Sequence, residues 1–478
     1  MAQPSLKVIT KEQQGSGESV EQALYEVRRK IYPRAVHGWF AAWRWALVWA
    51  TQLLFYGGAW LTWNGRQAVL FEIAQRKFYI FGLVFWPQDI IYLTVLLVIA
   101  ALSLFLFTAI AGRLWCGYAC PQTVYTEIFL WVEKLIEGDR AKRIRLDRSG
   151  LSLEKFLRKG AKHAAWIAIA LWTGFTFVGY FTPIRALWHE VWSASTGPWA
   201  TFWILFYGFA TYGNAGWMRE QVCKYMCPYA RFQSAMFDRD TLIITYDPER
   251  GEPRGPRARN IDYRAKGLGD CVDCGVCVQV CPTGIDIRNG LQYECIGCAA
   301  CIDGCNQVMD KMGTPRGLIR YSTEHAMENK LGRTEMFRRV FRPRSLIYIA
   351  ILVGIVVAAG VSLALRVPLK LDVIRDRAAI AREVAGGEIE NVYRLQIINT
   401  TEKARRFEIS VSGLHDIHLA GPAEVEVGAA SSLVEPLKAR VHAEREHLTP
   451  GTYRIEFEVR ALDDKRVKAE EKSVFIVR

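Results

Sequence analysis

The chain has no cysteine before Cys116 and none after Cys305, although it contains twelve in total. Disulfide frameworks spread through a secreted chain, whereas cysteines gathered in short runs are typical of metal sites. The polar segment Met1–Gly38 lacks the short apolar core of a cleaved signal peptide, so none is expected. A glycine-rich phosphate loop and a dinucleotide-binding fingerprint are also missing. These absences argue against a disulfide-stapled secreted protein and against an enzyme that binds a nucleotide.

The composition combines 51% hydrophobic residues with 23% charged residues and a net charge of +13. A high hydrophobic content and a high charged content are compatible in one chain if the apolar residues are concentrated in runs. The sixteen Trp and twenty-three Phe are typical of membrane spans with aromatic residues at the interface. Because the basic residues border the apolar runs, we expect membrane lipid, and not nucleic acid, to be their partner.

Five apolar runs are long enough to cross a bilayer, which takes about 20 residues per helix. They are residues 39–63, 88–111, 161–183, 198–218 and 345–365. Arg44 in the first run is expected to extend towards the interface. The alternative is that one run, 198–218, is a buried helix of a soluble domain. The alternation of flanking charge favours five spans.

Lysine and arginine are unevenly distributed among the connections between these runs. The basic connections contain Lys7, Lys11, Arg28, Arg29, Lys30 and Arg34 before the first run, ten basic residues from Arg113 to Lys159 after the second, and Arg333, Arg338, Arg339, Arg342 and Arg344 before the fifth. The connection after the third run has only Arg185. By the positive-inside rule, the N-terminus and the segment between the fourth and fifth runs are cytoplasmic, and the C-terminus lies outside.

Eight cysteines lie in two runs between the fourth and fifth apolar segments. The first run is Cys271, Cys274, Cys277 and Cys281, followed by Pro282, and the second is Cys295, Cys298, Cys301 and Cys305. Two residues between thiolates let the backbone wrap one 4Fe-4S cluster, and Gly275 and Gly297 allow close approach. The alternative is a pair of zinc sites, but zinc motifs usually separate two cysteine pairs by a longer gap.

In this pattern the fourth cysteine of each run ligates the other cluster. The ligands of cluster 1 are therefore predicted to be Cys271, Cys274, Cys277 and Cys305, and those of cluster 2 Cys295, Cys298, Cys301 and Cys281. The run departs from the usual pattern at Asn306, which stands where proline commonly follows the last cysteine.

The remaining four cysteines form a duplicated motif. Trp115 to Pro121 reads W-C-G-Y-A-C-P, and Val222 to Pro228 reads V-C-K-Y-M-C-P, each after an apolar run. The repetition indicates two related two-helix units. A spacing of four residues predicts that the two cysteines of each pair, Cys116 with Cys120 and Cys223 with Cys227, share one helical face. Four converging thiols would suit Cu(I), with Met226 as a further ligand, or a dithiol redox couple; the alternative is four inert buried cysteines.

The last part of the chain alternates apolar and polar residues with a period of two. The pattern is clear in 393–397, 407–411 and 453–459, and turn residues such as Gly413 separate such segments. It predicts a β-sandwich of about 110 residues.

Together these parts resemble the cytochrome c oxidase accessory protein family CcoG, also called FixG or RdxA. The resemblance covers essentially the whole chain and implies a multi-domain membrane protein with five spans, an inserted two-cluster ferredoxin-like domain and a C-terminal immunoglobulin-like domain. The expected divisions are a cytoplasmic segment 1–38, a membrane region 39–218, a cytoplasmic region 219–344 with the ferredoxin-like domain at about 262–312, a fifth membrane helix 345–365 and a periplasmic domain 366–478.

The resemblance also implies a role in assembling a cbb3-type oxidase in a bacterial inner membrane. The clusters would receive electrons from a cytoplasmic donor and reduce Cu(II) to Cu(I). The cysteines Cys116, Cys120, Cys223 and Cys227 would bind or reduce the copper, and the partners would be oxidase subunits, copper-delivery proteins or a second copy of the chain. The membrane half also looks like the NapH-type quinol-linked ferredoxins. A quinol-coupled relay without copper and a redox-sensing assembly scaffold are therefore the alternative functions.

Overall fold

The computed structural model describes residues 30–259, 261–376, 381–384, 387–442 and 448–477. It divides the chain into two compact units, of which one contains Met1–Trp60 and Leu96–Ile355 and the other Leu61–Val95 and Val356–Arg478. The basic residues Lys7, Lys11, Arg28 and Arg29, which supported the orientation of the N-terminus, lie outside the described residues.

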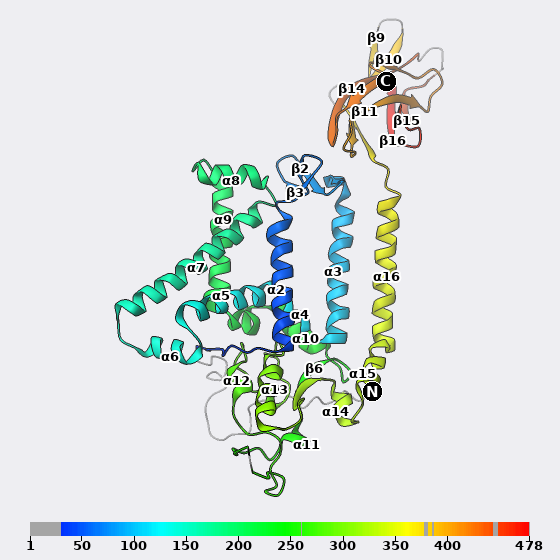
Figure 1. The fold of residues 1–478 in the computed structure, drawn as a ribbon. Coiled ribbons are helices and arrows are strands. Elements are labelled where there is room, and N and C mark those ends of the chain that lie inside the picture. Colours follow the sequence, from blue (N-terminus) through cyan, green and yellow to red (C-terminus); the bar gives the residue numbers. More distant parts are fainter. Residues whose placement is uncertain (1–29, 260, 377–380, 385–386, 443–447, 478) are drawn as a thin grey trace, which may run out of the picture. The chain divides into compact units, whose positions relative to one another are not determined.

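Each of the five apolar runs contains a long helix (Figure 1). The helices are α2 (Trp39–Gly58), α3 (Ile90–Ala111), α7 (Leu153–Val178), α9 (Pro198–Thr211) and α16 (Pro343–Ala364). Among the described residues, two helical segments, Pro87–Ala111 and Pro343–Ala364, are long and apolar enough to cross a membrane. The five predicted spans are therefore supported in two cases. Arg44 and the tryptophans lower the hydropathy of α2, and basic residues occupy the first turns of α7.

The first run was predicted to continue to Trp63, and this boundary is wrong. Helix α2 ends at Gly58, where two glycines in sequence disfavour the helix. The chain then turns through Asn64 and Gly65, which have φ values of 47° and 79°, and joins β1 (Thr62–Trp63) to β2 (Arg66–Gln67). An Asn-Gly pair with positive φ at both positions is the preferred turn of a tight hairpin.

Small residues allow α7 and α9 to pack closely in the first unit. A Cβ atom built on Gly174 would lie 2.9 Å from the backbone nitrogen of Gly208, so the two helices meet where both lack a side chain. Close approach at small residues is typical of helices that pack within membranes. Helix α9 continues as a π-helix, η2 (Tyr212–Met218).

The remaining elements of the first unit connect these helices or form the ferredoxin segment. They are α4 (Leu114–Tyr118), α5 (Pro121–Glu137), α6 (Arg140–Arg148), α8 (Ile184–Trp192), the π-helix η3 (Val222–Met226), α10 (Pro228–Met236), α11 (Pro248–Gly251), α12 (Val276–Gln279), η4 (Ile287–Asn289), α13 (Ala300–Met312), α14 (Glu324–Glu328), α15 (Arg333–Arg338) and η5 (Arg339–Phe341). Strands β6 (Ile243–Tyr246) and β7 (Ile319–Ser322) pair antiparallel and bracket the cysteine runs.

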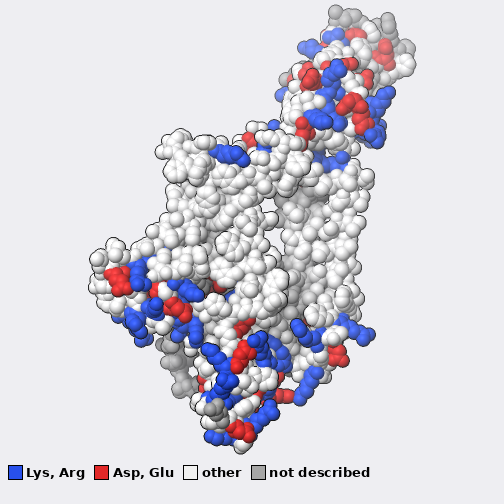
Figure 2. Space-filling view, in the orientation of Figure 1, with Lys and Arg blue, Asp and Glu red and all other residues white. Residues whose placement is uncertain are grey.

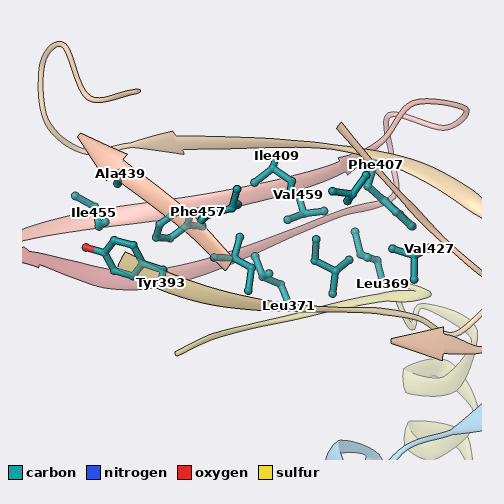
Figure 3. Close-up of a cluster of buried hydrophobic side chains, with 14 of the residues drawn as sticks. Leu369, Leu371, Tyr393, Phe407, Ile409, Val427, Ala439, Ile455, Phe457 and Val459 are labelled. Carbon is teal, nitrogen blue, oxygen red and sulfur yellow. The ribbon is translucent and has the colours of Figure 1, made fainter. Parts of the chain in front are cut away.

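The second unit contains the predicted β-sandwich. One sheet has the order β12-β14-β10-β8, with β9 also paired to β10, and the other has the order β13-β11-β15-β16. The strands are β8 (Leu369–Arg375), β9 (Arg382–Val384), β10 (Glu388–Asn399), β11 (Arg405–Ser412), β12 (His418–Ala420), β13 (Glu424–Val427), β14 (Ser431–His442), β15 (Gly451–Ala461) and β16 (Lys468–Val477). The core lies between the sheets, where Tyr393 meets Phe457 edge to face at 4.9 Å (Figure 3).

Residues before α3 also belong to this second unit. A three-stranded sheet, β3 (Val69–Glu72), β4 (Lys77–Ile80) and β5 (Leu83–Phe85), precedes the 3-10 turn η1 (Pro87–Asp89). Asp89 is buried and accepts a bond of 2.7 Å from Arg366, and it also pairs with Lys370. This ion pair joins the chain that leaves α16 to the start of α3.

Candidate redox centre

The two cysteine runs of the ferredoxin segment share one backbone shape. The residues on either side of the second cysteine have left-handed φ values in both runs, 52° at Asp273 and 64° at Gly275, and 69° at Gly297 and 58° at Ala299. Left-handed residues placed in this way turn successive N–H groups towards one point, and such concave backbone forms many iron–sulfur sites. The structure therefore repeats the internal symmetry of the cysteine spacing.

The eight thiols surround two neighbouring cavities. One is lined by Cys271, Cys274, Cys277 and Cys305, and the other by Cys281, Cys295, Cys298 and Cys301, with Cys277 at the edge of both. The walls are mainly apolar, with Tyr246, Met309, Leu318 and Ile319 around the first and Ile244, Ile285, Ile287 and Ile296 around the second. Four soft thiolates within an apolar shell fit a 4Fe-4S cluster. The grouping agrees with the one expected from spacing, while the ligation of a particular cluster by each thiol stays a prediction.

Without a bound metal, burial favours the protonated form of these thiols. Burial raises the pKa of Cys295 and of Cys305 to about 12, and that of Cys277 to about 11. Coordination to a metal ion reverses this preference because the positive charge stabilises the thiolate. The thiolate form of these cysteines is therefore favoured when iron is bound.

The second cysteine of each run differs in burial. Cys274, on the first cavity, is exposed, whereas Cys298, on the second, is buried. Cys298 belongs to a small apolar cluster with Val280, Ile296 and Ala300. The thiol of Cys298 is therefore shielded from solvent by this cluster.

The duplicated motifs do not form the continuous helices that the sequence predicted. Cys116 lies in α4, but Cys120 has an extended backbone with ψ of 129° and is the N-cap of α5. Cys223 lies in the π-helix η3, and Cys227 is likewise extended, with ψ of 107°, as the N-cap of α10. A residue that precedes proline is pushed out of the helical conformation, so Pro121 and Pro228 break the helix at the second cysteine of each motif. The expectation that each pair shares one helical face is wrong.

The two pairs nevertheless converge, and they do so beside the second cavity. Cys116 and Cys223 both pack against the apolar cluster that contains Cys298. The pKa of Cys223 is raised to about 12, mainly by burial and in part by the nearby thiols of Cys120 and Cys116. Burial also raises the pKa of Cys116 and of Cys120. The four thiols are thus close enough to interact, and two of them adjoin a predicted ligand of cluster 2.

A second contact joins the motif that contains Cys116 and Cys120 to the loop that contains Cys298. Gly117 lies against the main chain of Cys298, and a Cβ at position 117 would stand 2.7 Å from the Cα of Cys298. Gly297 in turn approaches the backbone of Arg113, with a built Cβ at 3.1 Å. A Cβ does not fit at position 117, and at position 297 the backbone of Arg113 would have to shift by a few tenths of an ångström.

A buried polar chain also connects the two sites. The thiol of Cys116 donates to Gln233 Oε1 at 3.2 Å, and Arg113 Nε donates to the same oxygen at 3.1 Å. The guanidinium of Arg113 donates further to the carbonyls of Cys295, at 3.3 Å, and Tyr293. The sequence patterns do not indicate a role for Arg113 and Gln233 at this site, because neither lies in a motif and their contacts join positions more than one hundred residues apart.

No group of three or more His, Cys, Asp or Glu side chains within the described part of the chain is arranged to hold a single metal ion. A 4Fe-4S cluster does not need such a group. Each thiolate of a cluster binds a different iron atom, so the sulfur atoms lie further apart than the ligands of one ion.

Three family models match the chain. A model described as a 4Fe-4S dicluster domain matches residues 218–324, and one described as a 4Fe-4S binding domain matches residues 93–138. A third, described as the IG-like fold at the C-terminal of FixG, matches residues 359–478. Iron–sulfur clusters are therefore the cofactors of this chain, and the C-terminal domain is immunoglobulin-like. The match over 93–138 includes Cys116 and Cys120.

Curated relatives match most of the chain. The nitrogen fixation protein FixG of Rhizobium meliloti (strain 1021) is 39% identical over 460 residues, which are 88% of each chain. Protein RdxA of Cereibacter sphaeroides is 39% identical over 86% of this chain and 89% of its own, and protein RdxB of the same organism is 40% identical over 85% and 86%. A crystal structure of a FixG-related protein from Vibrio parahaemolyticus matches 23% of this chain and 97% of its own, with 26% identity and a TM-score of 0.21.

These relatives and the two apolar helices indicate that the protein is associated with a membrane. With almost nine tenths of the FixG sequence aligned at 39% identity, the chain belongs to the FixG/RdxA family of iron–sulfur proteins.

Proposed function

We propose that this protein reduces Cu(II) to Cu(I) at its four motif cysteines and supplies Cu(I) for the assembly of a cbb3-type oxidase. The observation that supports the proposal most directly is the packing of Cys116 and Cys223 against the apolar cluster of Cys298. An electron that reaches cluster 2 would then be close to the sulfur atoms of Cys116 and Cys223. Thiolates favour Cu(I), so this position suits the product of the reduction.

The chemistry divides between the cofactor and the chain. When bound, the clusters supply electrons one at a time. Two thiols among Cys116, Cys120, Cys223 and Cys227 would bind the substrate copper, and each thiol that becomes a ligand releases a proton. Cu(II) takes up one electron and becomes Cu(I). Burial raises the pKa of Cys223 to about 12 and so keeps its proton in place until copper displaces it.

We infer further that the protein has five membrane spans, with the ferredoxin segment cytoplasmic and the C-terminal domain periplasmic. Within the first unit, the face shown in Figure 2 has lysine and arginine gathered over α6 and the ferredoxin segment. Few charges are visible along the helices between them and α8. This distribution supports the cytoplasmic side for the clusters. The periplasmic β-sandwich would then be available to oxidase subunits or copper-delivery proteins.

The proposal can be tested with holoprotein purified without oxygen. Dithionite reduces the clusters, the excess is removed, and Cu(II) is added together with a chelator that colours with Cu(I). We expect about two Cu(I) per chain, since each cluster stores one electron. A variant with all four motif cysteines replaced by serine is expected to keep its iron and its reduced-cluster EPR signals but to form Cu(I) at least about tenfold more slowly.

Iron analysis supplies the control for that variant. About eight iron atoms per chain should be present in both proteins, as expected for two clusters. Cu(I) formation at the full rate in the variant would contradict the proposal. A content of about twelve iron atoms in the unaltered protein and about eight in the variant would also contradict it, because the four thiols would then hold a third cluster.

A further inference from the structure

A cavity of about 530 Å³ lies at the N-terminal end of α7, within the first unit. Its walls are formed by residues 30–31, by α5, α6 and α7, and by residues 216–220. On the face shown in Figure 2, lysine and arginine gather over α6, which is one of these walls. Cavities that bind small organic ligands usually measure about 300–1,000 Å³, so this one is large enough for a phosphate group and its substituents.

The lining of this cavity is mainly basic. Its acidic residues are Glu133, Asp147 and Glu220, and its basic residues are Lys30, Lys155, Lys159, Lys162 and Arg219. Five positive charges against three negative ones leave an excess of two. Arg143 and Glu137, which pair with Glu133 and Lys159 from outside the lining, carry one charge of each sign and cancel. Because basic pockets between helices at the cytoplasmic surface are typical of lipid headgroup sites, this excess favours a phosphate group.

Lys155 has a hydrogen-bond donor left for such an anion. Its ammonium donates to the main-chain carbonyls of Asp147, at 3.1 Å, and Ser149, at 2.6 Å. Within the described part of the chain, Lys155 forms no ion pair with a carboxylate. An ammonium has three N–H donors, so these two bonds leave one. The side chain of Lys155 is partly exposed, so a ligand in the cavity can reach that donor.

The carboxylates of the lining already have donors of their own. Glu133 lies at the bottom of the cavity, where 1% of its side chain is exposed, whereas Lys30 is 47% exposed. Asp147 lies 2.6 Å from Lys30 and 2.5 Å from Lys159. The buried Glu220 accepts a hydrogen bond of 3.1 Å from Gln221. The accessible part of the cavity therefore presents ammonium groups to a ligand.

Exposed apolar side chains adjoin the basic residues of α7. Lys155 lines the cavity, and its neighbours on the helix, Leu153 and Phe156, are each 74% exposed. Trp217, which also lines the cavity, is 55% exposed. Tryptophan and basic residues side by side are typical of the membrane interface. A free phosphate ion gains nothing from such a surface, whereas a phospholipid has both a phosphate group and apolar chains.

From this arrangement we propose that the cavity binds the phosphate group of an anionic phospholipid of the cytoplasmic leaflet. The inference rests on the membrane span in α7 that belongs to the proposed function, because the cavity must lie at the membrane surface. Lys155 and Lys30 donate hydrogen bonds to the phosphate oxygens, and the acyl chains lie along the exposed apolar side of α7. A bound headgroup thereby joins α6 and α7 to the segment that precedes α2.

Binding is tested by native mass spectrometry of the full-length holoprotein in detergent, with phosphatidylglycerol added at increasing concentration. Lys155→Gln removes a positive charge without leaving a carboxylate unpaired. Arg158→Gln is the matched control, since it removes one positive charge from the same helix at an exposed position outside the cavity. We expect binding of phosphatidylglycerol to be about tenfold weaker in Lys155→Gln and unchanged in Arg158→Gln.

A second variant is needed because Lys155 also holds the turn between α6 and α7. Lys30 lies outside the helices, and in Lys30→Gln the carboxylate of Asp147 keeps Lys159 at 2.5 Å. We expect Lys30→Gln to weaken binding of phosphatidylglycerol as well. Iron content and the midpoint of thermal unfolding without lipid show whether each variant is folded. Phosphatidylglycerol should raise this midpoint more in the unaltered protein and in Arg158→Gln than in Lys155→Gln, since a ligand stabilises the state that binds it.

Two further ligands separate a lipid site from a site for free phosphate. Phosphatidylcholine has the same phosphodiester but no net charge, and inorganic phosphate has the charge but no apolar chains. We expect phosphatidylcholine to bind at least about tenfold more weakly than phosphatidylglycerol. Millimolar inorganic phosphate should not displace phosphatidylglycerol from the unaltered protein.

Three results would overturn the proposal. Equal binding of phosphatidylglycerol by Lys155→Gln, Lys30→Gln and Arg158→Gln would show that the cavity is not the site. Equal binding of phosphatidylcholine and phosphatidylglycerol would show that the charge is not recognised. Displacement of phosphatidylglycerol by inorganic phosphate would mean that the cavity is a free-phosphate site and that α7 does not place it at the membrane surface.

Reduction of Cu(II) after dithionite treatment separates this proposal from the copper function. The lining of the cavity contains no cysteine, so Lys155→Gln should form Cu(I) at the full rate. If the lipid site alone is wrong, all of these proteins still reduce copper. If the copper function alone is wrong, the unaltered protein binds phosphatidylglycerol but forms no Cu(I).

Discussion

Asp303 caps helix α2 from the ferredoxin segment. Its Oδ2 accepts a hydrogen bond of 2.7 Å from the backbone nitrogen of Ala41, and its Oδ1 accepts one of 3.4 Å from Phe40. Asp303 lies on α13 between Cys301 and Cys305. The first apolar helix is thus fixed to the helix that contains Cys301 and Cys305, and the cap is buried.

Replacing this cap should lower stability by a predictable amount. Asp303→Ala leaves two backbone N–H groups of α2 without an acceptor, and loss of an N-cap usually costs about 0.5–2 kcal/mol. We expect a lower midpoint of thermal unfolding for the holoprotein in detergent. Asp310→Ala on the same helix is the control, because Asp310 is exposed and forms an ion pair with Arg316 at the surface. Equal midpoints for the two variants would show that the cap does not hold the helix.

The contact between Gly117 and Cys298 predicts a selective effect on one cluster. A methyl group at position 117 would stand 2.7 Å from the Cα of Cys298, so Gly117→Ala must displace one of the two backbones. We expect the EPR signal of one reduced cluster to change while the other stays the same. Gly160→Ala, where a Cβ meets no other atom, should leave both signals unaltered. Identical spectra for both variants would mean that the loop moves without affecting the cluster.

Features that depend on local patterns can be predicted from this sequence. The spacing of the eight cysteines and the alternation in residues 393–397 depend only on near neighbours, and the structure has two cysteine cavities and a strand at those positions. Two further local patterns specify the path of the chain. Asn64-Gly65 specifies the hairpin after α2, and the prolines after Cys120 and Cys227 end the preceding helical turns.

Other features could not be read from one sequence because they join distant positions. The packing of Cys223 near Cys298 depends on how η3 meets the ferredoxin loop, which neither segment encodes alone. The ion pair of Arg44 with Glu127 spans two helices, and the sequence suggested only that Arg44 extends towards the interface. Contacts of this kind depend on tertiary packing, and residue spacing does not specify them.

Glu133 shows how strongly such distant contacts can determine stability. The carboxylate is buried on α5 and lies 3.0 Å from Arg143, 3.1 Å from Arg219 and 3.7 Å from Lys162. Removing it leaves three cations without their shared partner, and breaking a buried ion pair typically costs about 3–5 kcal/mol. We therefore expect Glu133→Gln to unfold at a much lower temperature. Glu154→Gln, which breaks only an exposed pair with Arg158, should be nearly neutral.

The ion pairs of Glu133 also predict that the stability of the protein depends on pH. Burial raises the pKa of Glu133, but the charges of Arg219, Arg143 and Lys162 outweigh burial and hold it below its ordinary value of 4.5. Because the folded pKa is the lower one, the stabilisation is complete above pH 4.5 and is lost as the pH falls from there through the folded pKa. The difference in unfolding midpoint between the unaltered protein and Glu133→Gln should thus shrink below pH 4.5. A constant difference between pH 7 and pH 3 would contradict this assignment of charge.

The arrangement of the two cysteine cavities predicts crossed ligation that can be seen in single variants. Cys281 lies in the first run but lines the cavity of the second, and Cys305 lies in the second run but lines the cavity of the first. Cys281→Ser and Cys298→Ser should therefore alter one EPR signal of the dithionite-reduced protein, and Cys305→Ser and Cys274→Ser should alter the other. Cys120→Ser, outside both cavities, is the control and should alter neither. If Cys281→Ser instead affects the same signal as Cys274→Ser, each run would hold its own cluster, and the relay would not cross between them.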